Sequence, residues 1–241
     1  MRSHHEPTAG YRESAVPAAI DEGLIAFFSL EPTLPFARVL IGARAPWPPE
    51  IVARVGVELA QALSEGTSER FDPFSTGLSA SGAWLLDLGL DALLRPEIRA
   101  QAGLRGSTSW LGYLAPESLR RRGAGDVTGN DLGARHGLGV LLHELLTGVP
   151  LYGGQTPLET LVALRRGLPE LLSKTVPGIP IDIAACVHAL LDHDPLRRPD
   201  PALVIDVLAP YAAPDLAWAQ PLLAAQARPL GHLPFGARRS G

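Results

Sequence analysis

The stretch LGVLLHELLTG, residues 138–148, decides the fold of this 241-residue chain. Its apolar residues occupy nearly every side of a helix rather than a single stripe, and such a helix must be covered by protein all round. Gly148 supplies a stop at the C-terminal end. The sequence therefore predicts a helix over 138–146 that is buried at the centre of a helical domain.

Helical patterns recur on both sides of this segment. Upstream, residues 50–63 carry apolar side chains at helical spacing, with proline confined to the start. Downstream, three further helices are predicted, each of them opened or closed by Pro or Gly. They cover residues 157–166, 181–192 and 201–208.

The N-terminal half carries the strand patterns. Residues 24–30 (LIAFFSL) are apolar and aromatic, as in a buried strand, and residues 31–33 (EPT) end the run. A short helix is expected over 36–41. Ser81-Gly82 separates two short runs, 77–80 and 83–87, and predicts a hairpin after a long loop. The fold class is therefore α+β, and mainly helical after residue 110.

We expect one domain over residues 21–210. Residues 1–20 show no period and are interpreted as a loose leader, and residues 211–241 as an Ala/Pro-rich tail. The N-terminus lacks the apolar run of a secretory signal, and no stretch of about 18 apolar residues occurs anywhere. These observations predict a cytoplasmic protein without a membrane partner.

Composition limits the function classes further. A hydrophobic fraction of 46% suits a protein with a packed core. The net charge of -4 argues against a nucleic-acid partner, because phosphate binding needs clustered Lys and Arg. Cys186 is the only cysteine, so neither an intrachain disulfide nor a thiolate cluster for a metal can form.

Four short segments, taken in order, resemble the C-terminal lobe of a bacterial serine/threonine protein kinase. The first resembles the strand that enters the Asp-Phe-Gly motif, and the second the Ala-Pro-Glu that closes the activation segment. The third is similar to the buried central helix of that lobe, and the last to its Asp-Pro-x-x-Arg-Pro segment. They are 85–89 (LLDLG), 112–117 (GYLAPE), 138–148 (LGVLLHELLTG) and 194–199 (DPLRRP).

The resemblance covers residues 24–208 and implies a protein-kinase-like fold. It makes residues 24–30 the strand that leads to the hinge between lobes, and residues 50–63 the long helix before the catalytic loop. About twenty residues precede that strand, and they contain neither a glycine-rich phosphate loop nor any lysine. The expected architecture is a mainly helical C-lobe with a truncated remnant of the N-lobe.

The residues that phosphoryl transfer requires in this family are missing. The only lysine, Lys174, and the only asparagine, Asn130, both follow the Ala-Pro-Glu match. With Pro73 on the catalytic-loop proline, Arg70 stands at the position of the base, and arginine cannot accept a proton. Ser75 stands at the metal-binding Asn. We therefore expect no catalytic residue, no metal and no cofactor.

Asp87 is the one candidate cofactor-binding residue that remains. The resemblance makes it a magnesium ligand that would support weak Mg-ATP binding. The alternative is a polar residue that ends a strand before a turn at Gly89.

Other matched residues are expected to be structural. In the family the Glu of Ala-Pro-Glu pairs with the Arg of the late Arg-Pro segment, which predicts that Glu117 pairs with Arg198. Pro116 and Gly139 belong to the same structural set. His136 and His143 are seven residues apart and could share a face of the buried helix as packed, neutral side chains.

Three functional hypotheses follow. The first is a catalytically inactive kinase-like (pseudokinase) domain that acts by binding another protein. The second is an atypical ATP-dependent serine/threonine kinase that uses Asp87 and Glu69. The third is a kinase fragment that needs a second chain to complete its fold, with self-association through the truncated N-lobe face as one form of it.

Overall fold

The computed structural model describes residues 16–21, 24–28, 33–35, 46–65, 71, 76–79, 82–85, 109–119, 130–154, 156–217 and 221. These residues are mostly helical and carry two small antiparallel sheets, a composition compatible with the expected α+β class. Within these ranges, no helix has both the length and the apolar character needed to cross a bilayer.

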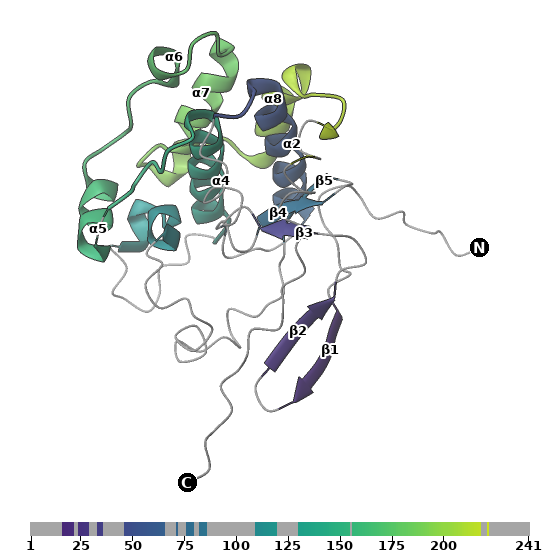
Figure 1. Ribbon diagram of the computed structural model, residues 1–241. Helices are drawn as coiled ribbons and strands as arrows, with labels where there is room; N and C mark the ends of the chain where they lie inside the picture. The colour runs from purple at the N-terminus through teal and green to yellow at the C-terminus, as the bar shows by residue number, and fades with distance from the viewer. Residues whose placement is uncertain are drawn as a thin grey trace.

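The central helix α4 (Asn130–Thr147) runs through the middle of the helical part (Figure 1). The prediction of a buried helix over 138–146 is confirmed, but α4 begins well before residue 138. Glycines at 133, 137 and 139 dilute the apolar pattern there and hide the first two turns. The fully buried leucines of α4 are Leu138, Leu141, Leu142, Leu145 and Leu146.

Three helices pack against α4 or against its neighbours. They are α2 (Pro49–Glu65), α7 (Ile181–Leu190) and α8 (Pro201–Leu208), and each matches a predicted helix. α2 packs on α4 and α8, while α4 packs on α7. Glycine allows α4 and α7 to approach closely, because a Cβ at Gly139 would lie 2.7 Å from the Cβ of Leu190.

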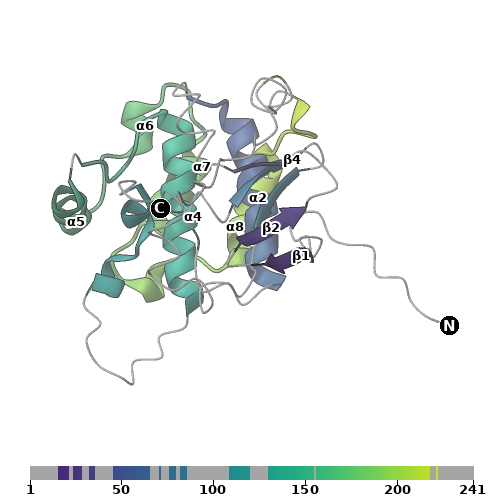
Figure 2. The same cartoon turned by 60° about the horizontal axis from the view of Figure 1, so that its bottom comes forward.

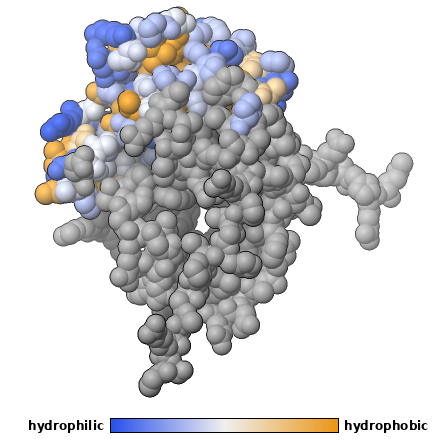
Figure 3. Space-filling model, viewed as in Figure 1, coloured by the Kyte–Doolittle hydropathy of each residue, from blue (hydrophilic) through white to orange (hydrophobic). Residues whose placement is uncertain are grey.

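The helices α5 (Pro157–Arg165) and α6 (Leu172–Thr175) complete the helical part. α5 lies on the side of α4 opposite to α2, as both ribbon views show (Figures 1 and 2). The side chain of Thr156 caps α5 by accepting a hydrogen bond from the backbone N–H of Glu159. Leu158 and Val162 of this helix are exposed, and Figure 3 shows such hydrophobic residues interspersed with hydrophilic ones.

The larger sheet has the strand order β3 (Thr33–Pro35), β4 (Thr76–Ser79), β5 (Gly82–Leu85). The hairpin predicted around Ser81-Gly82 is confirmed, since β4 and β5 pair with Ser79 opposite Gly82. β3, which starts at Thr33 just after the predicted end of the 24–30 run, was not predicted from the sequence. β3 is an edge strand, where Pro35 is tolerated because its missing N–H need not enter a ladder.

The smaller sheet corrects the prediction for the leader. β1 (Val16–Asp21) pairs with β2 (Leu24–Phe28), so the last residues of the predicted 1–20 leader form a strand. Pro17 and the alanines around it hid the strand pattern, and the pairing partner lies only a few residues further on. The strand predicted over 24–30 is present as β2, and the helix expected over 36–41 lies outside the described residues.

The packed part also continues past the boundary expected at residue 210. After the short helix η4 (Ala209–Tyr211), the backbone N–H of Ala213 donates to the carbonyl of Glu50 in α2, at 2.9 Å. Leu216 is then buried in the core. An Ala/Pro-rich composition gave no periodic signal for this contact, which depends on a single leucine and on backbone groups.

Candidate functional site

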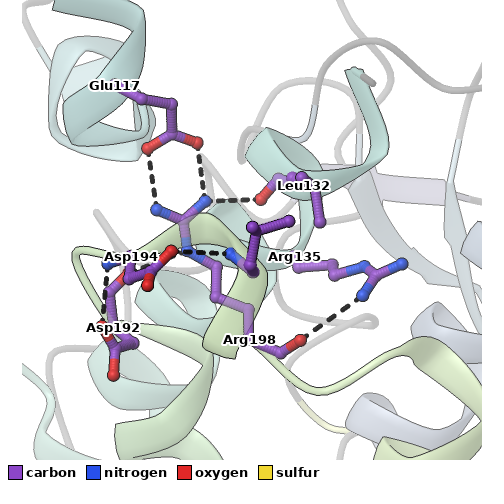
Figure 4. Close-up of polar contacts among 7 residues, drawn as sticks. Glu117, Leu132, Arg135, Asp192, Asp194 and Arg198 are labelled. Carbon is purple, nitrogen blue, oxygen red and sulfur yellow. Dashed lines mark hydrogen bonds and ion pairs between the residues drawn. The ribbon is translucent and has the colours of Figure 1, made fainter. Parts of the chain in front are cut away.

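The guanidinium of Arg198 joins four segments of the chain (Figure 4). It forms a bidentate pair with Glu117, in which Nη1 and Nη2 each donate to one carboxylate oxygen at 2.7 Å. Nη1 also donates to the carbonyl of Leu132 at 2.6 Å, and Nε to the carbonyl of Asp192 at 2.9 Å. We call this group of contacts the Arg198 anchor. It is the pairing that the resemblance predicts for Glu117 and Arg198.

Short elements place both partners of the anchor. Glu117 lies in the 3-10 helix η2 (Pro116–Leu119), and Arg198 directly follows the 3-10 helix η3 (Pro195–Arg197). Asp194 caps η3 by accepting from the backbone N–H of Leu196 at 3.1 Å. Prolines at 116 and 195 suit the first position of such turns, because their missing N–H groups would have no partner there.

Burial makes the anchor strong. The side chain of Arg198 is fully shielded from solvent, whereas that of Glu117 is 21% exposed. A charged group buried in this way is tolerated only where it is paired and hydrogen-bonded. Four of the five N–H donors of Arg198 form hydrogen bonds, so the anchor fixes η2 against α4 and against the chain between α7 and α8.

A second buried contact also ties the segment before η2 to α4. Tyr113, the last residue of the 3-10 helix η1 (Ser109–Tyr113), donates its hydroxyl to Glu144 of α4 at 2.7 Å. The other carboxylate oxygen accepts from the backbone N–H of Leu151 at 3.1 Å. Burial raises the pKa of Glu144 to about 7, and the two hydrogen bonds oppose that rise. Sequence reasoning missed Glu144 because one acid within an apolar helix resembles an exposed position.

The two histidines of α4 are buried, as their spacing predicted. His136 has no exposed surface and stacks on Tyr152, with the ring centroids 5.9 Å apart and the ring planes inclined by 13°. Burial, and to a lesser degree the charge of Arg198, lowers the pKa of His136 to about 3. Burial likewise lowers the pKa of His143 to about 4. Both imidazoles are therefore neutral at pH 7.

The buried carboxylate of Glu58 in α2 holds the β4–β5 hairpin. Glu58 of α2 accepts from Arg54 at 2.6 Å and from the backbone N–H of Ala83 at 2.5 Å. Gly82 adopts a φ of 151°, and a Cβ at that position would lie 2.8 Å from the Glu58 carboxylate. Glu58 thus links α2 to the strand that leads toward Asp87. The sequence offered a signal for it, because Glu58 falls on the same helix face as Val55 and Ala62.

The structure places some of the sequence-predicted site residues and not others. Pro116 is buried in η2 next to Glu117, and Gly139 lies at the contact between α4 and α7. Asp87, Glu69 and Ser75 lie outside the described residues, so their positions in the sequence are all that bears on nucleotide binding.

The described polar groups act as structural contacts. Glu58, Glu117 and Glu144 are each held by donors from neighbouring segments. Within the described ranges, no three His, Cys, Asp or Glu side chains come together in a way that could hold a metal ion. The arrangement holds a segment, residues 109–119, against a helical base.

Comparison with known proteins agrees with a kinase-like region. No protein-family model matches the chain. The chain is 34% identical over 121 residues to "Calcium-dependent protein kinase 9" of Oryza sativa subsp. japonica, a match that covers 50% of this chain and 19% of the rice protein. The match thus spans about a fifth of that relative, and it supports a kinase-related region in this chain.

Proposed function

We propose that this chain is a kinase-like domain that transfers no phosphate and acts by binding another protein. The proposal goes beyond the kinase-related similarity in two respects, the loss of activity and the binding role. The observation that carries it is the Arg198 anchor, retained in a chain that has lost the family's catalytic residue types.

The chain retains the contacts that hold its scaffold together. The anchor, the Tyr113–Glu144 bond and the buried face of α4 all serve to hold residues 109–119 on the helical base. Removing one partner of a buried ion pair costs roughly 3–5 kcal/mol, so the Glu117–Arg198 pair holds residues 109–119 in one arrangement and gives the chain a defined surface there. A defined surface is what a protein-binding module needs.

The chain lacks the residue types that phosphoryl transfer requires. Between residues 46 and 117, the part that resembles the catalytic loop and its surroundings, there is no Lys, no Asn and no His. Phosphoryl transfer depends on positioning ATP and magnesium with such groups. Mg²⁺ retains most of its waters and relies on carboxylates together with substrate phosphates, so Asp87 alone is a poor site.

A transfer assay tests the inactivity directly. The full chain is incubated with radiolabelled ATP and magnesium, alone and with casein as a general acceptor. We expect no label above that of a heat-denatured sample. Label that appears with native protein and disappears in Asp87→Ala or Glu69→Gln would overturn the proposal in favour of an atypical kinase.

The binding role requires that the chain be stable without a second chain. We expect a constant monomer mass in light scattering from micromolar to high-micromolar concentration. A mass that rises with concentration, together with a rising unfolding midpoint, would instead favour the fragment hypothesis, because association that stabilises the fold makes the midpoint concentration-dependent.

A further inference from the structure

A pocket of about 350 Å³ lies beside the Arg198 anchor, between η2 and the C-terminal end of α5. Its described walls are Pro116 and Leu119 of η2, Leu164 and Arg165 of α5, and His193 of the segment after α7. Pockets for small ligands span roughly 300–1,000 Å³, so this one lies at the lower end of that range. It combines three apolar side chains with two nitrogen-bearing ones.

The Arg198 anchor holds two walls of this pocket in place. Glu117, which pairs with Arg198, follows Pro116 directly in the chain. The carbonyl of Asp192, directly before His193, accepts from Nε of Arg198 at 2.9 Å. Because both segments are fixed on one buried guanidinium, the pocket is formed before a ligand arrives. A pre-formed site loses less free energy to ordering when it binds.

The polar groups of the pocket have no partner among the described residues. Nε2 of His193 is shielded from solvent and makes no hydrogen bond there. Arg165 is exposed in the last turn of α5 and pairs with no acid of the described part of the chain. A carboxylate is the one common side-chain group that can accept from both residues, and its bonds to a charged donor are the strong ones.

The acids nearest to the pocket are engaged elsewhere. Asp192 accepts from the backbone N–H of Asp194 at 2.8 Å, and Asp194 accepts from that of Leu196 at 3.1 Å. Asp194 also lies 3.6 Å from Nε of Arg197. Neither acid lines the pocket, and the anchor occupies the carboxylate of η2. The charge that complements Arg165 must therefore come from a ligand.

An exposed apolar strip on α5 leads to the pocket. Leu158, Val162 and Arg165 are spaced by four and three residues, so they lie on one face of the helix. Leu158 is 69% exposed and Val162 is 42% exposed. α5 stands at the edge of the helical part in both ribbon views (Figures 1 and 2). At about 1.5 Å per residue the strip spans about 10 Å, which suits a peptide segment better than a small carboxylate.

We propose that this pocket and strip bind an acidic segment of a partner protein, in which an apolar side chain lies next to an Asp or Glu. The carboxylate of the partner pairs with Arg165 and accepts from Nε2 of His193. The apolar side chain lies against Leu119 and Leu164. This inference rests on the proposed function, because it names the site and the chemistry of the partner that a protein-binding domain requires.

Peptide selection on the full chain tests the sign of the charge. A phage-displayed library of random dodecapeptides is selected on the immobilised unaltered chain, and selection on streptavidin is the positive control for the library. We expect the recovered peptides to be enriched in Asp and Glu beside Leu, Phe or Tyr, relative to the unselected library.

A charge reversal then tests the position of the site. The most enriched peptide is labelled with fluorescein, and its anisotropy is titrated with each variant. We expect Arg165→Glu to weaken binding about tenfold, because a hydrogen bond to a charged group is lost and a repulsion is added. A peptide with Lys in place of its acids should bind Arg165→Glu more tightly than it binds the unaltered chain.

Lys174→Glu is the matched control, because it reverses the same charge on another exposed side chain, in α6, away from the described lining. It should leave the affinity of the peptide unchanged. Circular dichroism and an unchanged unfolding midpoint show that both variants are folded, as expected for substitutions of exposed residues.

Recovered peptides without an acidic excess, or equal affinities for the unaltered chain and Arg165→Glu, would overturn the inference. The binding role would then belong to another surface, and the proposed function would stand. A failure to recover any peptide, with the streptavidin control positive, would count against the site in the same way. A mass that rises with concentration in the unaltered chain, and not in Arg165→Glu, would assign the surface to a second copy instead. Label in the transfer assay would overturn the proposed function whatever the peptides show.

Discussion

Replacing either partner of the Glu117–Arg198 pair should destabilise the protein far more than replacing a surface pair. Glu117→Ala leaves a fully buried guanidinium with two carbonyl acceptors and no counter-charge. Arg198→Ala removes the bonds to Leu132 and Asp192 as well and empties buried space. The two substitutions therefore strip different amounts from one contact network.

The structure sets the size of each effect. Losing one partner of a buried pair costs roughly 3–5 kcal/mol. Glu117 keeps 21% of its side-chain surface, so water replaces part of what is lost and we expect about 3 kcal/mol for Glu117→Ala. Arg198→Ala should cost about 5 kcal/mol, and the double variant about the same, which gives a coupling energy of about 3 kcal/mol.

Urea unfolding followed by circular dichroism measures the stability of the unaltered chain, the two single variants and the double variant. For a chain of this size, 3 kcal/mol corresponds to a midpoint lowered by about 6–12 °C in a thermal scan. Glu170→Ala, which removes an exposed partner of Lys174, is the control and should change stability by less than about 0.5 kcal/mol. If the two single losses of stability add up in the double variant, or are as small as that of the control, the Glu117–Arg198 pair does not act as a cooperative unit.

Three further predictions concern α4. Gly139→Ala should destabilise by about 1–3 kcal/mol because α4 and α7 touch there, whereas Gly133→Ala, whose Cβ has its nearest neighbour at 3.9 Å, should be neutral or stabilising in urea unfolding. Below about pH 6 the protein should lose stability, because the unfolded chain binds protons at histidines that stay neutral in the folded chain. In His136→Phe the unfolding midpoint should therefore fall less steeply between pH 6 and pH 4, and an unchanged dependence on pH would contradict this prediction. Tyr113→Phe should cost about 1–2 kcal/mol at pH 8.5, where Glu144 is ionised, and less at pH 5.5, where it is protonated; equal losses at both values would show that the carboxylate charge is not involved.

The helical part of the fold could be predicted from sequence because burial imposes a period on it. The predicted helices after residue 156 begin at prolines or next to them: Pro157 and Pro201 are the first residues of α5 and α8, and Pro180 precedes α7. The β4–β5 hairpin was also predictable, because Ser81-Gly82 separates two short runs. In each case a local signal and the tertiary packing agree.

The remaining elements depend on partners that the local sequence does not contain. β3 gains its strand structure from β4 across a long gap in the chain, whereas β1 pairs with the nearby β2 and its strand pattern was hidden by Pro17. The segment that leads to the buried Leu216 likewise depends on α2, through the hydrogen bond from Ala213 to the carbonyl of Glu50. A pattern within a few residues carries no information about such a partner.

The residues of the candidate site could likewise be predicted only in part. The Glu117–Arg198 pair could be named in advance only because the flanking motifs resemble a known family. Glu144 was missed because it is the one acid in the apolar run 138–148, and only the fold shows that it meets a donor, whereas Glu58 shares a helix face with Val55 and Ala62 and could have been found. Buried carboxylates of this kind are found from their partners rather than from their neighbours in sequence.

The most direct test of the central claim, a kinase-like scaffold without a working nucleotide site, is thermal unfolding with and without millimolar Mg-ATP. A ligand that binds the native state raises the midpoint according to RT ln(1 + [L]/Kd). The account predicts a cooperative transition with an unchanged midpoint. A magnesium-dependent rise that is abolished by Asp87→Ala would contradict it and show that a nucleotide site has survived.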